Sequence, residues 1–355
     1  MEPINFSKFA KISKEYGKKF DFDEIVNKLN SLRPDFYIFS SYIDLLTKAG
    51  NLKKIVLANN IQLFKWKDKF DATLKFDKKK CLSLIITKNK NGTNHEEDCK
   101  TCCSCNYNQN LNLFSDKIID LLGYNRNART YLRLYYSELD LKACYICNAQ
   151  YALSIDPEDK DTKSDSVQSR HMSKFQFDHF LPKSIYPCFS ISLYNLLPIC
   201  SGCNSIKNND DIGINYLSND MTIFENAFKF KLVESSLTSF LLNNEKLKID
   251  FIDNYSYHPG VKKISDRFDL KGIYNTQTDI IEELIHRKLK YSETYKQKLS
   301  NSFPKIFSNT SIEERILLGT YTKKDGIQKR PMSKFTQDIN TQLDEYFEAK
   351  IKSLK

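Results

Sequence analysis

Residues 176–184 read QFDHFLPKS, and the pair Asp178-His179 places a carboxylate next to an imidazole. The aromatic residues around the pair favour a strand. Neighbouring side chains of a strand point to opposite faces. For both side chains to serve one site, the chain would have to leave strand geometry at this pair, and Leu181-Pro182 would fix that departure.

Two C-x2-C turns enclose this stretch. ACYIC contains Cys144 and Cys147, and CSGC contains Cys200 and Cys203. Each turn directs two thiolates to one point, with backbone amides softening their charge, and two turns complete the tetrahedral four-cysteine site that suits Zn²⁺. Four protein ligands leave no open position, so this zinc is predicted to be structural. The alternative is two unrelated cysteine pairs.

A second cysteine cluster lies in CKTCCSC, which contains Cys99, Cys102, Cys103 and Cys105. These residues could supply a second metal site, although four ligands within seven residues are sterically cramped. The alternatives are a redox-sensitive loop and a simply exposed one. In a reducing compartment, clustered cysteines indicate metal before disulfide.

Polar residues downstream of the pair have the chemistry of a hydrolytic site. YNLLPIC contains Asn195, and CNSIK contains Asn204 and Lys207. Asp178 and Asn204 offer hard oxygens, which suit Mg²⁺ or Mn²⁺. A neutral imidazole with a pKa of about 6.5 lets His179 take a proton from water. Two strands and one helix around a metal are the simplest shape that this segment permits.

The combined pattern C-x2-C, D-H, N, C-x2-C-N-x2-K resembles the HNH endonuclease family, in its variant with two C-x2-C turns. The resemblance covers residues 144–208 and implies a ββα-metal core that cuts phosphodiester bonds. It implies His179 as the general base and Asp178 and Asn204 as metal ligands. It gives Asn195 a supporting role, in which it pins the loop and orients His179. Asn204 stands where the family often has histidine.

Basic residues are candidates for contacts with nucleic acid. Lys207 follows the last cysteine by about one helical turn and could hold a phosphate, and Lys183 and Arg133 are further candidates. The net charge is +10, and basic residues outnumber acidic ones nearly two to one over residues 1–95. Such a flank suggests a polyanionic partner. The alternative is the general lysine bias of some proteomes.

The pattern predicts a helix-rich α+β fold in three regions. Residues 1–110 form a basic N-terminal region of helices and a small β element, which we place in residues 53–88. Residues 111–215 form the HNH nuclease module with its leading helices, and residues 216–355 form a mostly helical region. We expect residues 89–112 to be a loop or an inter-domain boundary.

Apolar spacing predicts several individual helices. We expect a short helix that Ser115 caps and that ends near Gly123, and a second over residues 127–139. Longer helices are predicted over residues 279–299 and 333–355. Residues 216–260 are predicted to be strand and loop.

The favoured function is a metal-dependent endonuclease acting on DNA. The alternatives are an RNA-cleaving effector, acting for example on tRNA, and a zinc-stabilised nucleic-acid-binding protein without catalysis. The layout more loosely resembles bacterial restriction or anti-phage effectors, such as Septu-type and retron-associated HNH proteins. That resemblance implies a partner ATPase or other defence subunit, and double-strand cutting would imply a homodimer. No apolar run reaches the roughly 18–20 residues of a bilayer span and no secretory signal is visible, so we expect a cytoplasmic protein.

Overall fold

The computed structural model describes residues 7–73, 85–88, 94–97, 103–155, 172–173, 175–208, 210, 212–214, 227–257, 259–305, 315–316 and 318–353. This part of the chain is helix-rich with small two-stranded sheets, which confirms the predicted α+β class. The chain divides into two compact units. Unit 1 comprises Met1–Ala10, Arg133–Asp178 and Leu197–Lys355, and unit 2 comprises Lys11–Leu132 and His179–Leu196. The three regions proposed from the sequence stay a prediction.

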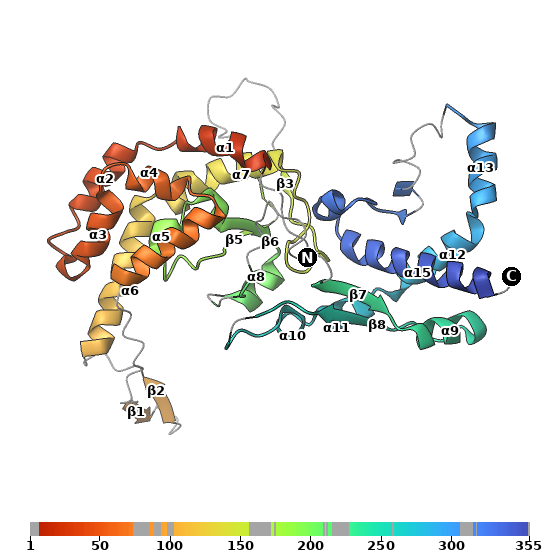
Figure 1. Ribbon diagram of the computed structural model, residues 1–355. Helices are drawn as coiled ribbons and strands as arrows, with labels where there is room; N and C mark the ends of the chain where they lie inside the picture. Colours follow the sequence, from red (N-terminus) through yellow and green to blue (C-terminus); the bar gives the residue numbers. More distant parts are fainter. Residues whose placement is uncertain are drawn as a thin grey trace, which may run out of the picture. The chain divides into compact units, whose positions relative to one another are not determined.

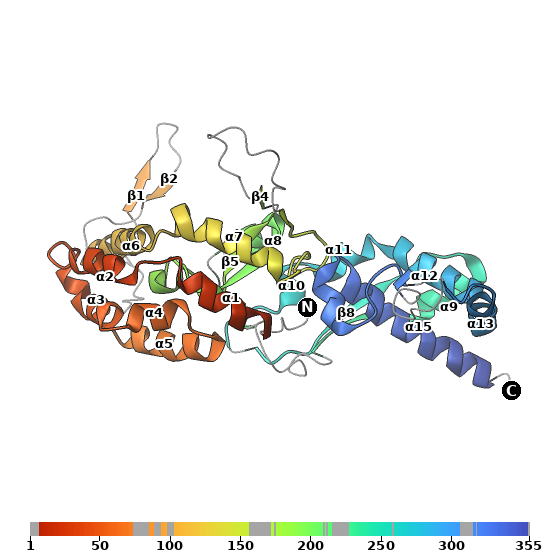
Figure 2. The same cartoon turned by 90° about the horizontal axis from the view of Figure 1, so that it is seen from above.

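Helices form most of unit 2 (Figure 2). Its described elements are α1 (Ser7–Gly17, whose first residues belong to unit 1), α2 (Phe22–Asn30), η1 (Tyr37–Phe39), α3 (Ser40–Thr47), α4 (Asn51–Val56), α5 (Asn60–Thr73), β1 (Ile85–Lys88), β2 (Asn94–Glu97), α6 (Cys103–Leu121), η2 (Tyr124–Ala128), η3 (Pro187–Phe189) and η4 (Leu193–Asn195). α7 (Arg129–Glu138) begins in unit 2 and ends in unit 1. The helices expected in the N-terminal region are therefore confirmed among its described residues, and so is the helix predicted over residues 127–139.

Aromatic packing builds the core of unit 2. Phe39 stacks on Phe114 with ring centroids 4.6 Å apart, and Tyr42 packs against Phe70 at 4.5 Å. Phe70 also meets Phe189 edge-to-face. All five rings are buried, so residues 187–189 are part of this core although they lie far along the chain.

The β element predicted within residues 53–88 is wrong over most of its described length. The structure has α4 and α5 there, and only β1, paired antiparallel with β2, is a strand. Asn59 and Gln62 form a reciprocal capping box at the start of α5, with backbone-to-side-chain bonds of 2.9 and 3.0 Å. Leu63 and Phe70 then bury one helical face. The alternating lysines masked this helical signal.

The loop predicted over residues 89–112 is wrong from Cys103 onward, where α6 begins. Ser115 lies inside α6 and is buried, so it caps nothing. Leu111, Phe114 and Ile118 repeat at helical spacing, which shows that the apolar face starts before Ser115. The predicted end of this helix is confirmed, since Gly123 follows with a φ of +71°.

Unit 1 contains the remaining small sheets and the C-terminal helices (Figure 1). Its described elements are β3 (Ser154–Ile155), β4 (Met172–Ser173), β5 (Gln176–His179), β6 (Leu196–Ile199), α8 (Ser201–Lys207), β7 (Phe228–Leu232), α9 (Glu234–Asn243), β8 (Ile249–Asp253), α10 (Ile264–Arg267), α11 (Leu270–Asn275), α12 (Thr278–Lys290), α13 (Glu293–Ser302), η5 (Lys324–Lys329) and α15 (Ser333–Ser353). β5 and β6 reach across the unit boundary by one residue each.

α15 covers the free edge of β7, as Figure 1 shows. β7 pairs antiparallel with β8, which leaves backbone groups of its other edge to be satisfied. Asp338 accepts from the Phe230 amide at 2.9 Å, and Gln342 accepts from the Leu232 amide at 3.0 Å. Gln342 also donates to the Phe230 carbonyl at 2.7 Å. Asp338 and Gln342, one helical turn apart on α15, thus supply the hydrogen bonds that a third strand would form with β7.

The C-terminal helices differ from the prediction in two places. The helix predicted over residues 279–299 is two helices, α12 and α13. The first helix ends with Tyr291 as its C-cap, and Ser292 is the N-cap of α13. Residues 216–260 contain the helix α9 between the expected strands. The helix predicted over residues 333–355 is confirmed as α15 as far as Ser353.

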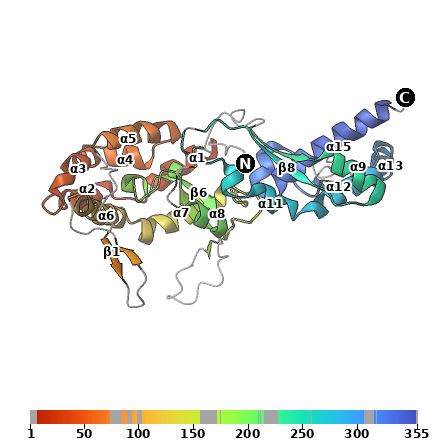
Figure 3. The ribbon, with the colours of Figure 1, turned by 90° about the horizontal axis from the view of Figure 1, so that it is seen from below.

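β5 and β6 pair in a two-stranded sheet, and Figure 1 labels both strands. α8 follows β6 directly (Figure 3). The expected order of two strands and a short helix is therefore confirmed. β5 continues through His179, and the chain bends at Phe180, one residue later than expected. Asp178 and His179 are thus consecutive residues of one regular strand.

Candidate functional site

The four cysteines of the two C-x2-C turns converge in unit 1. Their Sγ atoms all lie within 4.8 Å of one another, and the Cys147 and Cys200 sulfurs are 4.0 Å apart. Zinc about 2.3 Å from each sulfur of a tetrahedron separates the sulfurs by about 3.8 Å. The two C-x2-C turns are therefore not unrelated pairs, and the arrangement has the dimensions of a four-cysteine zinc site.

Backbone amides support the thiolates. The Ala149 amide donates to the Cys147 sulfur at 3.4 Å, and the Cys203 amide donates to the Cys200 sulfur at 3.5 Å. The second bond also caps the N-terminus of α8. Among the described residues no lysine, arginine or histidine donates to these sulfurs.

The close sulfurs perturb one another's titration. Burial raises the pKa of the Cys144 thiol. Hydrogen bonds with the other three cysteines, Cys144 first, lower the pKa of the Cys200 thiol. Hydrogen bonds of Cys203 with its own three cysteine neighbours, again Cys144 first, raise the pKa of the Cys203 thiol. Four crowded thiols cannot all ionise without a cation, so the donor set fits a bound Zn²⁺.

Asn148 braces the first C-x2-C turn. It is buried and adopts a left-handed conformation, with a φ of +52°. Its side chain donates to the Ile327 carbonyl at 3.0 Å and accepts from the Lys334 amide at 3.1 Å, near the start of α15. Tyr274 donates to the Cys147 carbonyl at 2.7 Å. The C-terminal region of unit 1 therefore holds the cysteine turn in place.

Asp178 lies in a buried ion pair with Lys207. The Lys207 Nζ is 2.9 Å from Oδ1 of Asp178, and the two side chains are 1% and 3% exposed. Tyr145, which stands between the first two cysteines in sequence, donates its hydroxyl to Oδ2 of the same carboxylate. Lys207 therefore points into unit 1, and its charge is balanced by Asp178 rather than directed to solvent.

Asn204 lies on α8 and is half-buried. Its amide nitrogen donates to Oε1 of Gln176, two residues before Asp178 on β5. Within the described chain nothing donates to the amide oxygen of Asn204. That oxygen fits a hard metal ion by its chemistry.

His179 is buried in unit 2. Its Nε2 lies 3.0 Å from the Ser190 carbonyl oxygen, and its ring meets Tyr124 edge-to-face at 4.9 Å. A carbonyl oxygen can only accept, so Nε2 carries the proton in a neutral ring and Nδ1 is the basic nitrogen. The strand therefore gives each residue of the Asp178-His179 pair different neighbours.

Asn195 ties together the loop that follows His179. Its side-chain oxygen accepts from the Leu181 amide at 2.7 Å, and its nitrogen donates to the carbonyls of Leu181 and Phe189 at 3.0 and 3.1 Å. Asn195 is fully buried. These bonds fix both ends of the loop from residue 181 to 189.

Lys183 shares an aromatic neighbour, Tyr124, with His179. Lys183 lies over the Tyr124 ring at 4.7 Å, and burial, together with the charge of Arg129, lowers its pKa. Arg133 lies on α7 and is half-buried. Of the second cysteine cluster, Cys99 and Cys102 and the side chains of Cys103 and Cys105 lie outside the described residues.

Sequence reasoning missed three contributors. Tyr145 and Tyr124 contact the two residues of the central pair, and Asn148 supports the cysteine turn. The signal for Tyr145 was its place inside ACYIC, and Asn148 follows that turn where a left-handed residue is common. Nothing local pointed to Tyr124.

No family model, curated protein or solved structure matches this chain significantly. Among the helices that the structure describes, none has the length and apolar character needed to cross a membrane.

Proposed function

We propose that the protein is a metal-dependent HNH-type endonuclease that hydrolyses phosphodiester bonds in DNA. One observation carries the proposal. The β5–β6–α8 segment bears an acid–base pair on its first strand and begins its helix inside a four-cysteine cluster. A binding module needs neither a carboxylate and an imidazole in sequence nor an asparagine on the following helix.

His179 acts as the general base in this proposal. Its Nε2–H donates to the Ser190 carbonyl, which holds the tautomer in which Nδ1 accepts a proton from water. Asn195 keeps the loop around this histidine in one conformation through its three backbone bonds. The base is therefore held rigidly.

Asp178 and Asn204 would hold Mg²⁺ or Mn²⁺, which would neutralise charge on the attacked phosphate. An ionised carboxylate has about four acceptor positions, so the bonds from Lys207 and Tyr145 leave Asp178 acceptor capacity. The zinc held by the four cysteines is structural, since four protein ligands close its coordination.

The test is a cleavage assay with purified full-length protein, plasmid DNA and Mg²⁺ or Mn²⁺. We expect His179→Ala to reduce cleavage by at least about 100-fold, because general-base catalysis contributes on that scale. His286→Ala is the matched control, since that histidine is exposed on α12. Equal cleavage by the two variants would refute the role of His179.

The choice of DNA rests on the resemblance alone, and the alternative is an RNA-cleaving effector. Both substrates carry the same phosphodiester group. Parallel assays on matched DNA and RNA, including tRNA, decide between them. Faster cleavage of RNA would move the proposal to a ribonuclease with the same residues.

The buried ion pair favours a second candidate, a zinc-stabilised nucleic-acid-binding protein without catalysis. Lys207 already neutralises Asp178, so that carboxylate does not require a divalent ion for charge balance. Salt-dependent DNA binding with no cleavage under Mg²⁺ or Mn²⁺ would establish this candidate.

A role in bacterial defence, with a partner ATPase, is a proposal that rests on the looser resemblance of layout. A homodimer is a separate proposal, which double-strand cutting would imply. Light scattering of the purified protein, alone and with DNA, tests the homodimer.

A further inference from the structure

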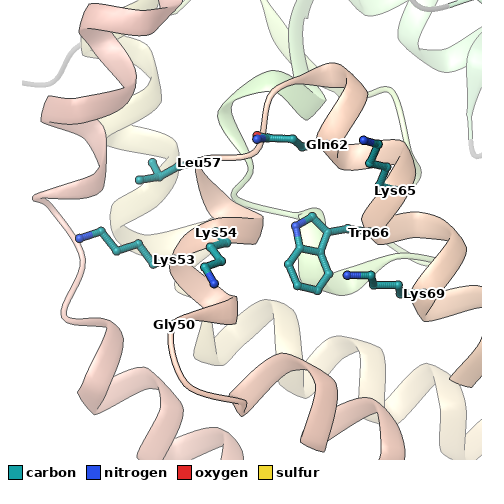
Figure 4. A pocket seen from close by; sticks show the side chains of 8 residues that line it. All are labelled: Gly50, Lys53, Lys54, Leu57, Gln62, Lys65, Trp66 and Lys69. Atoms are coloured by element: carbon teal, nitrogen blue, oxygen red, sulfur yellow. The ribbon is translucent and has the colours of Figure 1, made fainter.

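A basic groove lies between α4 and α5 of unit 2, as Figure 4 shows. It measures about 580 Å³ and is open to solvent. The described residues that line it are Gly50, Lys53, Lys54, Leu57, Gln62, Lys65, Trp66 and Lys69. None of the residues assigned to the nuclease site belongs to this groove.

The groove concentrates positive charge without a counter-charge of its own. Its four lysines are exposed, and none of the described residues that line it is acidic. Lys65 and Lys69 stand one helical turn apart on α5, where like charges repel. On another face of the same helix, Lys67 pairs with Asp71 at 2.6 Å. The lysines of the groove face therefore repel one another, and an anionic ligand would relieve this repulsion.

Trp66, the single tryptophan of the chain, lies among these lysines. Its indole is half-buried, and Lys69 Nζ lies 4.4 Å from its ring centroid. In Figure 4 the ring stands between Lys54 and Lys69. The Lys69 side chain is flexible, so its ammonium group can leave the ring and contact a phosphate. The ring face of Trp66 is then available for stacking with a base.

We infer that this groove binds a single strand of nucleic acid, with its phosphates on the lysines and a base on Trp66. An indole can stack only on a base that is not paired inside a duplex. The charge also exceeds what one phosphate would neutralise, since α4 and α5 each contribute two lysines to the groove. A strand therefore fits the groove better than a mononucleotide does.

The groove and the proposed nuclease site would both bind nucleic acid. The groove shares no residue with that site and needs no metal. Binding is measured in buffer without added Mg²⁺ or Mn²⁺, so the outcome does not depend on cleavage. His286→Ala, at an exposed histidine of α12 outside both sites, is expected to bind the strand as the unaltered protein does.

The lone tryptophan provides the readout. An oligothymidylate of about 12 nucleotides is titrated into the full chain while tryptophan fluorescence is recorded. We expect saturable quenching that weakens as salt rises. Polyphosphate of equal charge, duplex DNA and thymidine monophosphate are expected to quench less than the strand.

Substitutions at matched net charge test the lysines. Lys54→Gln/Lys69→Gln is expected to raise the Kd for a labelled strand at least 10-fold, measured by anisotropy. The control, Lys14→Gln/Lys117→Gln, removes two exposed lysines of α1 and α6 and is expected to change it less than about 2-fold. Trp66→Ala should raise the Kd at least about 5-fold, and Trp66→Phe less, because phenylalanine keeps a stacking face.

Three results would overturn the inference. The first is strand binding without quenching. The second is an equal loss of affinity in the groove and control variants, each checked for folding by circular dichroism. The third is quenching by duplex, polyphosphate or mononucleotide that matches quenching by the strand.

Discussion

Two buried polar clusters of unit 1 balance their charge in opposite ways. The four cysteines bring like groups together, and among the described residues no basic side chain donates to them. Asp178 instead lies against Lys207, which supplies a cation from within the chain. α8 contributes to both clusters, through Cys203 and Lys207.

The difference predicts which of the two clusters depends on a bound cation for folding. Four crowded thiols need an external cation to ionise, so zinc binding and folding of this region should be coupled. The Asp178–Lys207 pair is neutral without a metal, so a divalent ion bound there would contribute little to folding.

The largest effect should follow loss of the zinc site. We expect about one tightly bound zinc per chain by elemental analysis, and we expect Cys200→Ser to abolish that zinc and unfold the region around α8. Metal binding to such sites contributes roughly 10 kcal/mol or more in zinc-finger peptides. Circular dichroism and limited proteolysis measure the loss of structure.

Cys188→Ala is the control for zinc content. Cys188 is a buried thiol of unit 2 outside the cluster, so its removal should leave one zinc per chain. Purified protein without zinc would contradict the metal assignment. Two zinc ions per chain would instead support a second site at the cluster of residues 99–105.

Breaking the buried ion pair should be the next largest effect. Lys207→Met leaves the Asp178 carboxylate buried without its cation, which costs about 3–5 kcal/mol in comparable pairs. Urea unfolding measures the change, and Lys246→Met, at an exposed lysine of the same unit, should change stability little.

The same variant tests metal binding at Asp178. Without the lysine, Mg²⁺ or Mn²⁺ becomes the available counter-ion, so either ion should raise the melting temperature of Lys207→Met more than that of the unaltered protein. Equal shifts in the two proteins would indicate that the ion does not bind at Asp178.

Asn148 should contribute through its conformation and its bonds. Asn148→Gly keeps the left-handed backbone but loses the bonds to Ile327 and Lys334, at a cost of about 2 kcal/mol. Asn148→Ala should destabilise the protein by roughly 1 kcal/mol more than Asn148→Gly does, because alanine is strained at positive φ. Unfolding free energies of both variants check the order, and an alanine variant as stable as the glycine variant would contradict it.

An exposed ion pair of unit 1 provides the smallest effect. Lys142 lies 2.8 Å from Asp140, and both side chains are at least one-third exposed. Partial burial raises the pKa of Asp140, but the hydrogen bond and charge of Lys142 hold it below its usual value. A lowered folded pKa means that the stabilisation is complete above the unfolded value of about 3.9 and is lost as the pH falls through the folded value.

Water screens this exposed pair, so Lys142→Gln should cost less than about 1 kcal/mol at pH 7. The difference from the unaltered protein should shrink as the pH falls below about 4. Urea unfolding at pH 7 and pH 3 measures it. A difference as large as that of Lys207→Met would remove the contrast between buried and exposed pairs.

Local sequence signals predicted part of the fold. The helical spacing of apolar residues identified α15 almost to its end, and the order of β5, β6 and α8 followed from a short apolar run, two prolines and a cysteine turn. α5 was missed because three lysines alternate with apolar residues along it, although the Asn59–Gln62 capping box marked its start. The first half of α6 was missed because polar residues fill its first turns, whereas its end near Gly123 was predicted.

The sequence by itself determined the four-cysteine site, because each C-x2-C spacing is local and presents two sulfurs to one point. It also determined that a carboxylate and an imidazole follow each other directly, but the departure from strand geometry expected at this pair was wrong, since both residues lie on β5. Only the tertiary structure decided what each of them contacts. Lys207 turns inward because packing brings α8 against β5, and a buried carboxylate then binds the nearest cation. That pairing depends on residues 29 positions apart, so no local pattern could predict it.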